Sequence, residues 1–425
     1  MKNQFKGFYS PSTHNYKSMW ESDKTLFVFD TNVLLNLYAY TKDTRKDFFK
    51  IMDKVSDRIW LPYHVGLEYQ KNRLSIIKIE KSIFNQINKY IENIEKVSSL
   101  EKIKELKLHQ RFPELESETE NMVKKIHDTL KIYKKEVVSV NKLQPDVRSH
   151  DKIRTVIDTL FEEKVGEKPE NQEWLDKLYK EGEKRYSNKF PPGYEDEKEK
   201  KDHKSFSYDG LNYIPMYGDL IIWKQIIEKA ENSEYENLIF ITDDVKEDWW
   251  YIIDSNGTKR IGARAELREE ICNQTDINNF EILNTTMFLE DGNKFLDTTI
   301  TSDSINETKK KFENERDKYR TISEIADRYT ELEKYISKTS SLDEYQKSLK
   351  KDLDNIYDSD IYQKLFKDLY DLNVNNSYSI DEDYLKSLKD FYNIKVNNSY
   401  SIDEDYLKKL QELGKAFKDK KKKDD

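Results

Sequence analysis

The chain has 425 residues, of which 36% are charged and 36% are hydrophobic, and it contains 28 Tyr, 19 Phe and 6 Trp. This aromatic content excludes a fully disordered chain, because disordered segments lack the apolar side chains that build a core. The single cysteine, Cys272, excludes a disulfide framework and a zinc site made of several cysteines. The formal net charge of −9 does not fit a protein that simply coats nucleic acid.

The sequence gives no sign of a membrane-bound or secreted protein. No run approaches the roughly 18 apolar residues of a membrane span, and the N-terminal segment lacks the apolar stretch of a signal peptide. We therefore expect a cytoplasmic protein with no membrane partner. The composition, rich in Lys, Asn, Ile and Tyr, favours an AT-rich genome and hence a bacterial source.

Four short apolar runs predict β-strands, at residues 26–30, 58–61, 237–242 and 280–283. Runs that are apolar at every position are typical of strands covered on both faces, as in a parallel sheet between helices. Segments with helical periodicity follow the first run and precede the third. This alternation of strands and helices predicts an α/β fold.

The predicted sheet is interrupted by a long helical segment, so that four regions are expected. Residues 1–70 form the first half of an α/β domain, and residues 71–189 form a helical insertion. Residues 190–300 complete the domain, beginning with a charged, exposed and mobile loop at 190–214. Residues 301–425 form a helical C-terminal region, in which residues 374–388 recur at 396–410 with a 22-residue period. This repeat is either a duplicated helical hairpin or a surface that binds a partner.

Carboxylates follow the predicted strands at their carboxyl ends, where α/β sheets bind ligands. Each acid alone fits a helix cap or a surface position. Together they form a negative cluster that needs a cation, and Mg²⁺ or Mn²⁺ is the natural partner of an all-oxygen site. Such a site suits phosphodiester hydrolysis. The acids are Asp30, Glu68, Asp219, Asp243, Asp244 and Asp248.

Five segments occur in an order that resembles the PIN domain family of metal-dependent nucleases. They read FVFDTNVLLNLY, LPYHVGLEYQKNR, PPGY, YGDLIIWKQII and IFITDDVKEDWW. The chain resembles more narrowly the PIN-like branch with a long helical insertion between the second and third acidic motifs. The resemblance covers residues 20–290. It implies a three-layer α/β/α fold with a parallel central sheet, and an acidic pocket for one or two divalent ions.

Carried over position by position, the resemblance assigns the first three family acids to Asp30, Glu68 and Asp219. The fourth is Asp244, with Asp243 as the alternate metal ligand and Asp248 as an outer acid. Hydroxyl and amide groups nearby would orient carboxylates or water through hydrogen bonds. These supporting residues are Thr31, Asn32 and Thr242.

A polyanionic substrate needs positive charge near these acids. The candidates are Lys71, Arg73, Lys246 and, in the charged loop, Lys201 with its neighbouring lysines. The alternative for each lysine is an ordinary solvated side chain, and the alternative for Arg73 is to orient Glu68. For the pair Trp249-Trp250 we favour packing against the sheet over base stacking.

The filled acidic positions favour an active metal-dependent endonuclease. RNA is expected as its substrate by analogy with stand-alone PIN proteins, some of which are toxins or defence effectors. No residue that reads a 2′-hydroxyl can be recognised, so a nuclease of single-stranded or flap DNA is the alternative. A further alternative is an inactive scaffold that binds a protein partner through the insertion or the C-terminal region.

Overall fold

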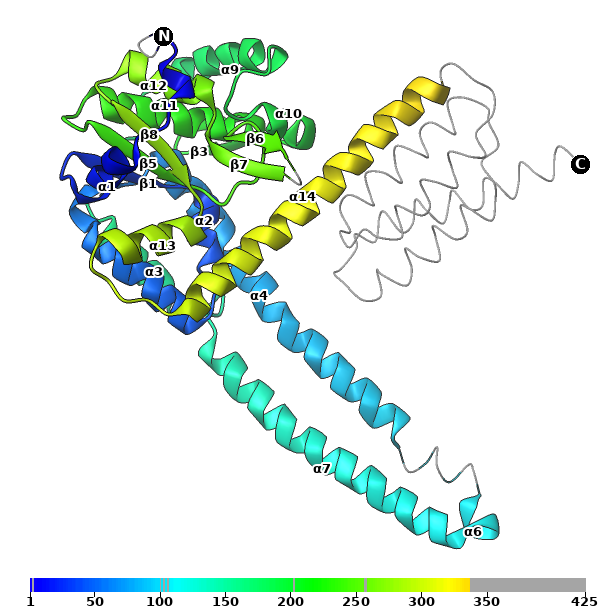
Figure 1. Ribbon diagram of the computed structural model, residues 1–425. Coiled ribbons are helices and arrows are strands. Elements are labelled where there is room, and N and C mark those ends of the chain that lie inside the picture. The colour runs from blue at the N-terminus through cyan, green and yellow to red at the C-terminus, as the bar shows by residue number, and fades with distance from the viewer. Residues whose placement is uncertain are drawn as a thin grey trace, which may run out of the picture. The chain divides into compact units, whose positions relative to one another are not determined.

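The computed structural model describes residues 1, 4–99, 101, 104, 107–201, 203–255 and 258–336 (Figure 1). The chain divides into two units, residues 1–317 and 318–425, and the first of them contains the sheet. The duplicated segment at 374–410 lies outside the described residues. Within the described part of the chain, no helix is both long and apolar enough to cross a membrane.

A parallel sheet of four strands forms the centre of the first unit. Its spatial order is β2-β1-β5-β8. The four strands coincide with the four apolar runs, and the prediction of an α/β fold with a parallel central sheet is confirmed. They are β1 (Thr25–Phe29), β2 (Ile59–Trp60), β5 (Asn237–Ile241) and β8 (Asn279–Leu283).

Helices cover both faces of this sheet, which explains why the strands are mainly apolar and buried along almost their whole length. On one face, Phe29 contacts Phe48 and Phe288, with the Phe29 and Phe288 ring centroids 5.4 Å apart. On the other face, Phe280 packs against Trp223 at the same centroid distance. Figure 1 shows the two layers. The first consists of α1 (Thr13–Glu21), α3 (Lys42–Lys54) and α13 (Thr285–Phe295), and the second of α11 (Gly218–Glu231) and α12 (Ala265–Gln274).

The long helical segment consists of two different parts. One is a hairpin of α4 (Tyr63–Val97) and α7 (Pro113–Leu143), with the short α6 (Leu108–Arg111) near its tip (Figure 1). The other contains α8 (Lys152–Leu160) and α9 (Gln172–Ser187), whose apolar side chains belong to the cores of the domain. Because α4 runs through position 71 without a break, the segment that leaves the domain is the α4–α7 hairpin alone.

The prediction of an exposed, mobile loop at 190–214 is wrong for much of this segment. Residues 191–196 are buried, α10 spans Tyr194–Lys200, and β3 (Phe206–Tyr208) and β4 (Leu211–Tyr213) form an antiparallel hairpin. The reason is a partner distant in sequence, because the Asp248 carboxylate accepts hydrogen bonds from the backbone N–H groups of Gly193 and Glu195. Gly193 has φ of 92°, a conformation that glycine adopts without strain.

The remaining elements complete the first unit or lead out of it. An antiparallel hairpin of β6 (Trp250–Asp254) and β7 (Thr258–Ala263) follows the fourth acidic motif. Trp249 and Trp250 are both buried, in agreement with the packing interpretation. The short helices are α2 (Thr31–Asn36), η1 (Lys6–Phe8), η2 (Ser56–Arg58) and η3 (Pro215–Tyr217), and α14 spans Ser302–Ile336.

Candidate active site

Asp30 lies at the junction of β1 and α2, where the chain leaves the carboxyl end of the sheet. It is the N-cap of α2, and its Oδ1 accepts a hydrogen bond from the Thr31 backbone N–H at 2.7 Å. Its Oδ2 accepts from Asn32 Nδ2 and from the Thr242 hydroxyl, both at 2.6 Å. The capping role and a functional role are therefore compatible, since these neighbours fix the orientation of a buried carboxylate.

Glu68 lies in the second turn of α4 and is tied to the same junction. Its Oε2 accepts a hydrogen bond from the Thr31 hydroxyl at 2.8 Å, so Thr31 contacts both carboxylates. The buried His64 ring lies one turn earlier, with Nε2 3.6 Å from Glu68 Oε1. The start of α11 is close as well, because a Cβ on Gly218 would lie 3.1 Å from Glu68 Oε1. The sequence prediction did not include His64.

Asp219 lies in the first turn of α11, directly after Gly218. Its Oδ2 accepts a hydrogen bond from the indole N–H of Trp249 at 3.2 Å. The start of α10 approaches it from the other side, because a Cβ on Gly193 would lie 3.2 Å from the Asp219 Cβ. Trp249 therefore packs against the sheet and also positions an acid.

The two acids after β5 point to different surroundings. Asp243 Oδ1 accepts from the Thr285 backbone N–H at 2.8 Å, and its Oδ2 accepts from Asn36 Nδ2 and the Thr285 hydroxyl. Asp244 Oδ1 accepts from the backbone N–H of Lys246 at 2.7 Å, and its Oδ2 lies 4.0 Å from Lys246 Nζ. Asp243 thus fastens β5 to α13, whereas Asp244 faces the acidic cluster.

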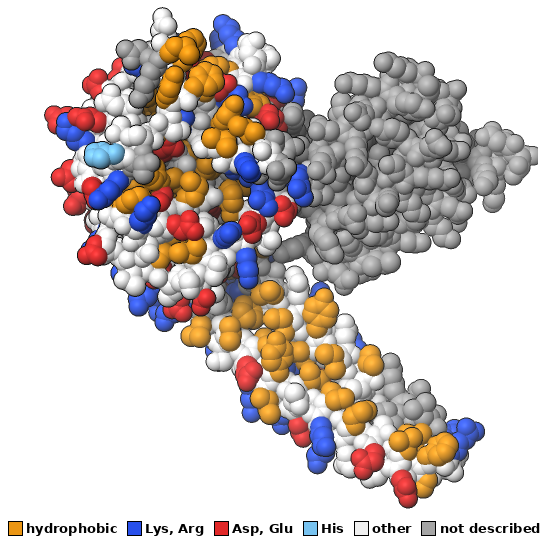
Figure 2. Space-filling view, viewed as in Figure 1, with side chains coloured by type: hydrophobic (Ala, Val, Ile, Leu, Met, Phe, Trp, Pro, Cys, Tyr) orange, Lys and Arg blue, Asp and Glu red, His pale blue; other side chains and the backbone are white. Residues whose placement is uncertain are grey.

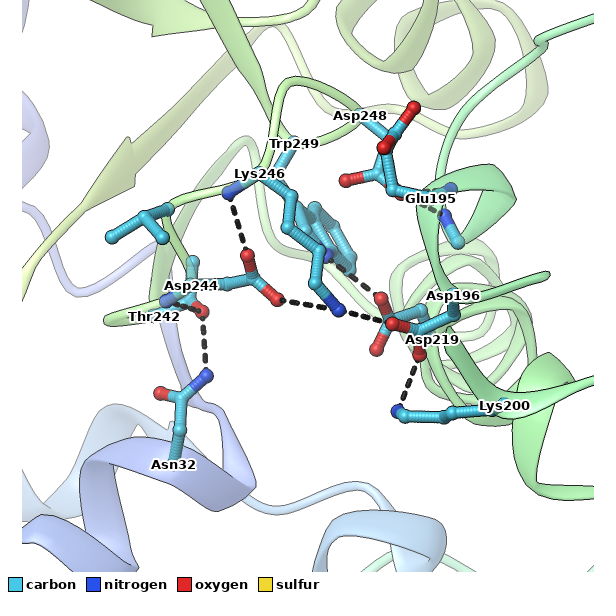
Figure 3. Close-up of polar contacts among 12 residues, drawn as sticks. Asn32, Glu195, Asp196, Lys200, Asp219, Thr242, Asp244, Lys246, Asp248 and Trp249 are labelled. Carbon is cyan, nitrogen blue, oxygen red and sulfur yellow. Dashed lines mark hydrogen bonds and ion pairs between the residues drawn. The ribbon is translucent and has the colours of Figure 1, made fainter. Parts of the chain in front are cut away.

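A buried acid that sequence reasoning missed, Asp196 of α10, is the centre of a charge network (Figure 3). Its carboxylate forms ion pairs with Lys246 and Lys200. Lys246 therefore lies between Asp196 and Asp244. The signal in the sequence is weak but present, because Asp196 and Lys200 are four residues apart, the spacing of an ion pair within a helix.

Asp248 is completely buried and acts on the backbone rather than on the acidic cluster. Its Oδ2 accepts from the two N–H groups at the start of α10. Its Oδ1 has no hydrogen-bond partner among the described residues. Asp248 holds the segment that carries Asp196, and this places it behind the cluster.

The pKa shifts show that the acids form one electrostatic site. Burial, with the negative charges of Asp244 and Glu68, raises the pKa of Asp30 to about 7. The hydrogen bonds from Thr242 and Thr31 lower this pKa but do not cancel the rise. Burial, with the charges of Asp196 and Asp244, raises the pKa of Asp219 well above its usual range, although Lys200 and Lys246 oppose this. Burial and Asp244 also raise the pKa of Asp248 to about 7. The site has an excess of negative charge that two lysines only partly neutralise.

The donor set fits a hard divalent cation in kind, because it consists of carboxylate oxygens. In this arrangement, among the residues that the structure describes, no three His, Cys, Asp or Glu side chains gather closely enough to hold an ion. Lys246 already occupies part of the space between Asp196 and Asp244. The raised pKa values are the observation that supports the fit, since a cation would offset both the burial and the repulsion that raise them.

The four predicted substrate-binding side chains lie in different places. Arg73 donates to Asp151 at 3.2 Å, so the expectation that it contacts substrate or orients Glu68 is not supported. Lys71 Nζ lies 3.1 Å from the centroid of the Phe206 ring. Lys246 is engaged by Asp196 inside the cluster, and Lys201 is exposed just after α10.

A parallel α/β sheet with a cluster of carboxylates at its carboxyl edge defines a domain of the PIN type. The family model described as a PIN like domain matches residues 26–267, more than half of the chain, and the protein belongs to this family. PIN domains are in general nucleases and typically use divalent metals. Searches of curated proteins and of solved structures found no match to this chain.

Proposed function

We propose that the protein is a divalent-metal-dependent endonuclease that hydrolyses phosphodiester bonds of RNA. One observation carries the proposal. Four carboxylates from separate segments of the chain, Asp30, Glu68, Asp219 and Asp244, lie around the carboxyl edge of the sheet and are coupled electrostatically or through shared contacts. Carboxylates gathered at one edge of a sheet attract a divalent cation, and a cation held there would in turn bind a phosphate.

In this proposal Asp30, Asp219 and Asp244 hold the principal ion, and Glu68 positions a second ion or the attacking water. Bound Mg²⁺ or Mn²⁺ supplies positive charge for the phosphate and lowers the pKa of a bound water. The chain supplies orientation, because Thr31, Asn32 and Thr242 fix the Asp30 carboxylate by hydrogen bonds. We expect products with a 5′-phosphate.

The hydrogen bonds separate the ligand candidates from their neighbours. Asp243 is left out of the proposed metal set because both of its oxygens accept from groups of α2 and α13. Asp248 supports the site from behind by fixing the start of α10. Asp244 is the acid of the strand-end motif that remains available.

The choice of RNA over DNA, and a role as toxin or defence effector, rest on analogy with other PIN proteins. The alternatives are a nuclease of single-stranded or flap DNA, and a catalytically inactive scaffold. A scaffold would bind its partner without Mg²⁺ or Mn²⁺, and loss of Asp30 would leave that binding unchanged.

The test is cleavage of labelled single-stranded RNA and of DNA with the same sequence, in Mn²⁺ or in EDTA. We expect wild type to cut RNA only with metal, and Asp30→Asn to cut it at least about 1,000-fold more slowly, a loss of roughly 4 kcal/mol of transition-state stabilisation. Asp128→Asn, which changes an exposed acid of α7, is the matched control. Cutting of DNA alone would favour the DNA nuclease, and no cutting by the folded protein would favour the scaffold.

A further inference from the structure

A cavity of about 640 Å³ lies beside the candidate active site and takes no part in the proposed chemistry. It is bounded by the first turns of α4, by α8 and by the β3–β4 hairpin. Its volume lies in the range of roughly 300–1,000 Å³ that is usual for ligand sites. Its lining includes the aromatic side chains of Tyr63, Phe206 and Tyr208.

The cavity is adjacent to the acids because both use the same helix. Leu67 and Lys71 line the cavity and flank Glu68 on α4. The charge of Glu68 acts on Lys71, which confirms that the two side chains are close. Leu61, which follows β2 at the carboxyl edge of the sheet, forms another part of the wall. The cavity and the acidic cluster are therefore separated by no more than the width of α4.

The chemistry of the walls matches a nucleobase, which is a flat aromatic ring with a polar edge. Tyr208 is 53% exposed, so its ring is available for stacking. The Lys71 ammonium already lies over the face of Phe206, where it could also approach a phosphate of the strand. The Gln70 amide and the Asp158 carboxylate supply groups that can hydrogen-bond to a base edge.

We propose that this cavity binds an unpaired nucleobase of the substrate strand, one or a few nucleotides from the phosphate that is cut. The inference rests on the proposed nuclease function. A base inside a duplex is stacked on both sides and cannot enter, so the cavity selects single-stranded substrate.

The experiment scans one abasic nucleotide along a single strand of the type that wild type cuts. In single-turnover cleavage, we expect an abasic nucleotide at one position to slow wild type by roughly 5- to 150-fold, the range of one lost base stack. Tyr208→Ala and Phe206→Ala should cut the intact strand more slowly and show little further loss with the abasic strand. Tyr251→Ala, which removes an exposed aromatic ring of β6, is the matched control and should behave as wild type.

A second measurement separates failure of the cavity from failure of the nuclease. In EDTA, the fluorescence of 2-aminopurine at the sensitive position should be quenched by wild type and not by Tyr208→Ala. The cavity proposal would be overturned if the abasic nucleotide slowed wild type and Tyr208→Ala equally, or if its effect did not depend on position. The nuclease proposal would still stand in that case, provided that Asp30→Asn abolished cleavage. If wild type cuts no strand, 2-aminopurine is placed at each position in turn and its quenching by wild type is measured. The absence of quenching at every position would overturn the cavity proposal as well.

A different observation concerns the α4–α7 hairpin, which exposes large apolar side chains along its length. Figure 2 shows hydrophobic side chains along this arm. On α4 they recur at the three- and four-residue spacing of one helical stripe and include Ile83, Tyr90 (68% exposed) and Val97 (71% exposed). A second stripe on the same helix, containing Ile77, Phe84 and Ile91, is buried. Helix α7 also exposes apolar residues in two pairs with seven-residue spacing, Leu115 with Met122 and Tyr133 with Val140.

We propose that the arms of two copies of this chain pair through these exposed stripes to form a four-helix bundle. The available area supports a second copy as the occupant. Helix α7 has 31 residues. At ~1.5 Å per residue it is about 46 Å long, and two helices of ~10 Å diameter give a face of about 900 Å². Stable interfaces bury about 800 Å² per partner, and a symmetric dimer needs one surface that complements itself.

The test is the molar mass of the full chain in solution by light scattering coupled to size exclusion. We expect wild type to have twice the mass of one chain and the variant Ile83→Glu with Tyr90→Glu to have the mass of one chain. The control variant Lys89→Glu with Lys96→Glu introduces two glutamates on another exposed side of α4, roughly 100° around the helix from the stripe, and should leave the dimer intact. A wild-type monomer at about 100 μM, or a dimer that survives the stripe variant, would overturn the proposal.

Discussion

Asp244→Asn should slow cleavage by at least about 1,000-fold without unfolding the protein, whereas Asp243→Asn should weaken the fold and spare the chemistry. Asp244 faces the acidic cluster and accepts from one backbone N–H, so its replacement removes a proposed metal ligand and little structure. A loss of this size corresponds to roughly 4 kcal/mol of transition-state stabilisation.

Asp243 differs because donors surround both of its oxygens, from Asn36 and Thr285. An asparagine there would turn an NH₂ group toward N–H or O–H donors and leave buried groups without a partner. We expect Asp243→Asn to lose about 1–3 kcal/mol of unfolding free energy. Urea unfolding and single-turnover cleavage on both variants check the pair. A large loss of activity in a stable Asp243→Asn, with Asp244→Asn active, would exchange the two roles.

The metal-free protein should become less stable as the pH rises from 6.5 to 8.5, and Mn²⁺ should reverse this loss. The pKa of Asp30 and that of Asp248 are each raised to about 7 in the folded state, mainly by burial. The folded chain therefore binds protons that the unfolded chain has already released. The stabilisation from this proton binding is complete below the unfolded pKa and is lost as the pH rises through about 7.

We expect a loss on the order of 1 kcal/mol for each of these two acids over this pH range. Burial lowers the pKa of His64, which gives the opposite trend at lower pH, and the range above 6.5 avoids most of it. Metal at 100 times its dissociation constant would add about 2.7 kcal/mol at pH 8.

Urea unfolding in EDTA and in Mn²⁺ measures these effects, with Asp30→Asn as the comparison. Because asparagine does not titrate, the metal-free variant should show a shallower decline with pH and a smaller gain with Mn²⁺. A wild-type protein whose stability rises between pH 6.5 and 8.5 in EDTA would contradict the burial of these acids. Equal stabilisation of both proteins by Mn²⁺ would place the ion elsewhere.

The sequence by itself determined the sheet, because its signal is local. The four strands are short, mainly apolar runs that are buried along almost their whole length, which is the pattern of strands covered on both faces. The positions of Asp30 and Asp244 follow from the same logic, since each comes just after a strand. The motifs of the PIN family could be read in the same way, and the family match agrees with them.

Only the tertiary structure decided where the charged side chains go. Arg73 pairs with Asp151, 78 residues away, and Lys246 pairs with Asp196, 50 residues away. The charged segment after Pro192 reads as solvated, yet Asp196 is buried because Lys200 and Lys246 compensate its charge. The Asp248 carboxylate holds the backbone just before it, at Gly193 and Glu195. An apolar run reports its own burial, whereas a charge can be buried or solvated depending on a partner that folding brings to it.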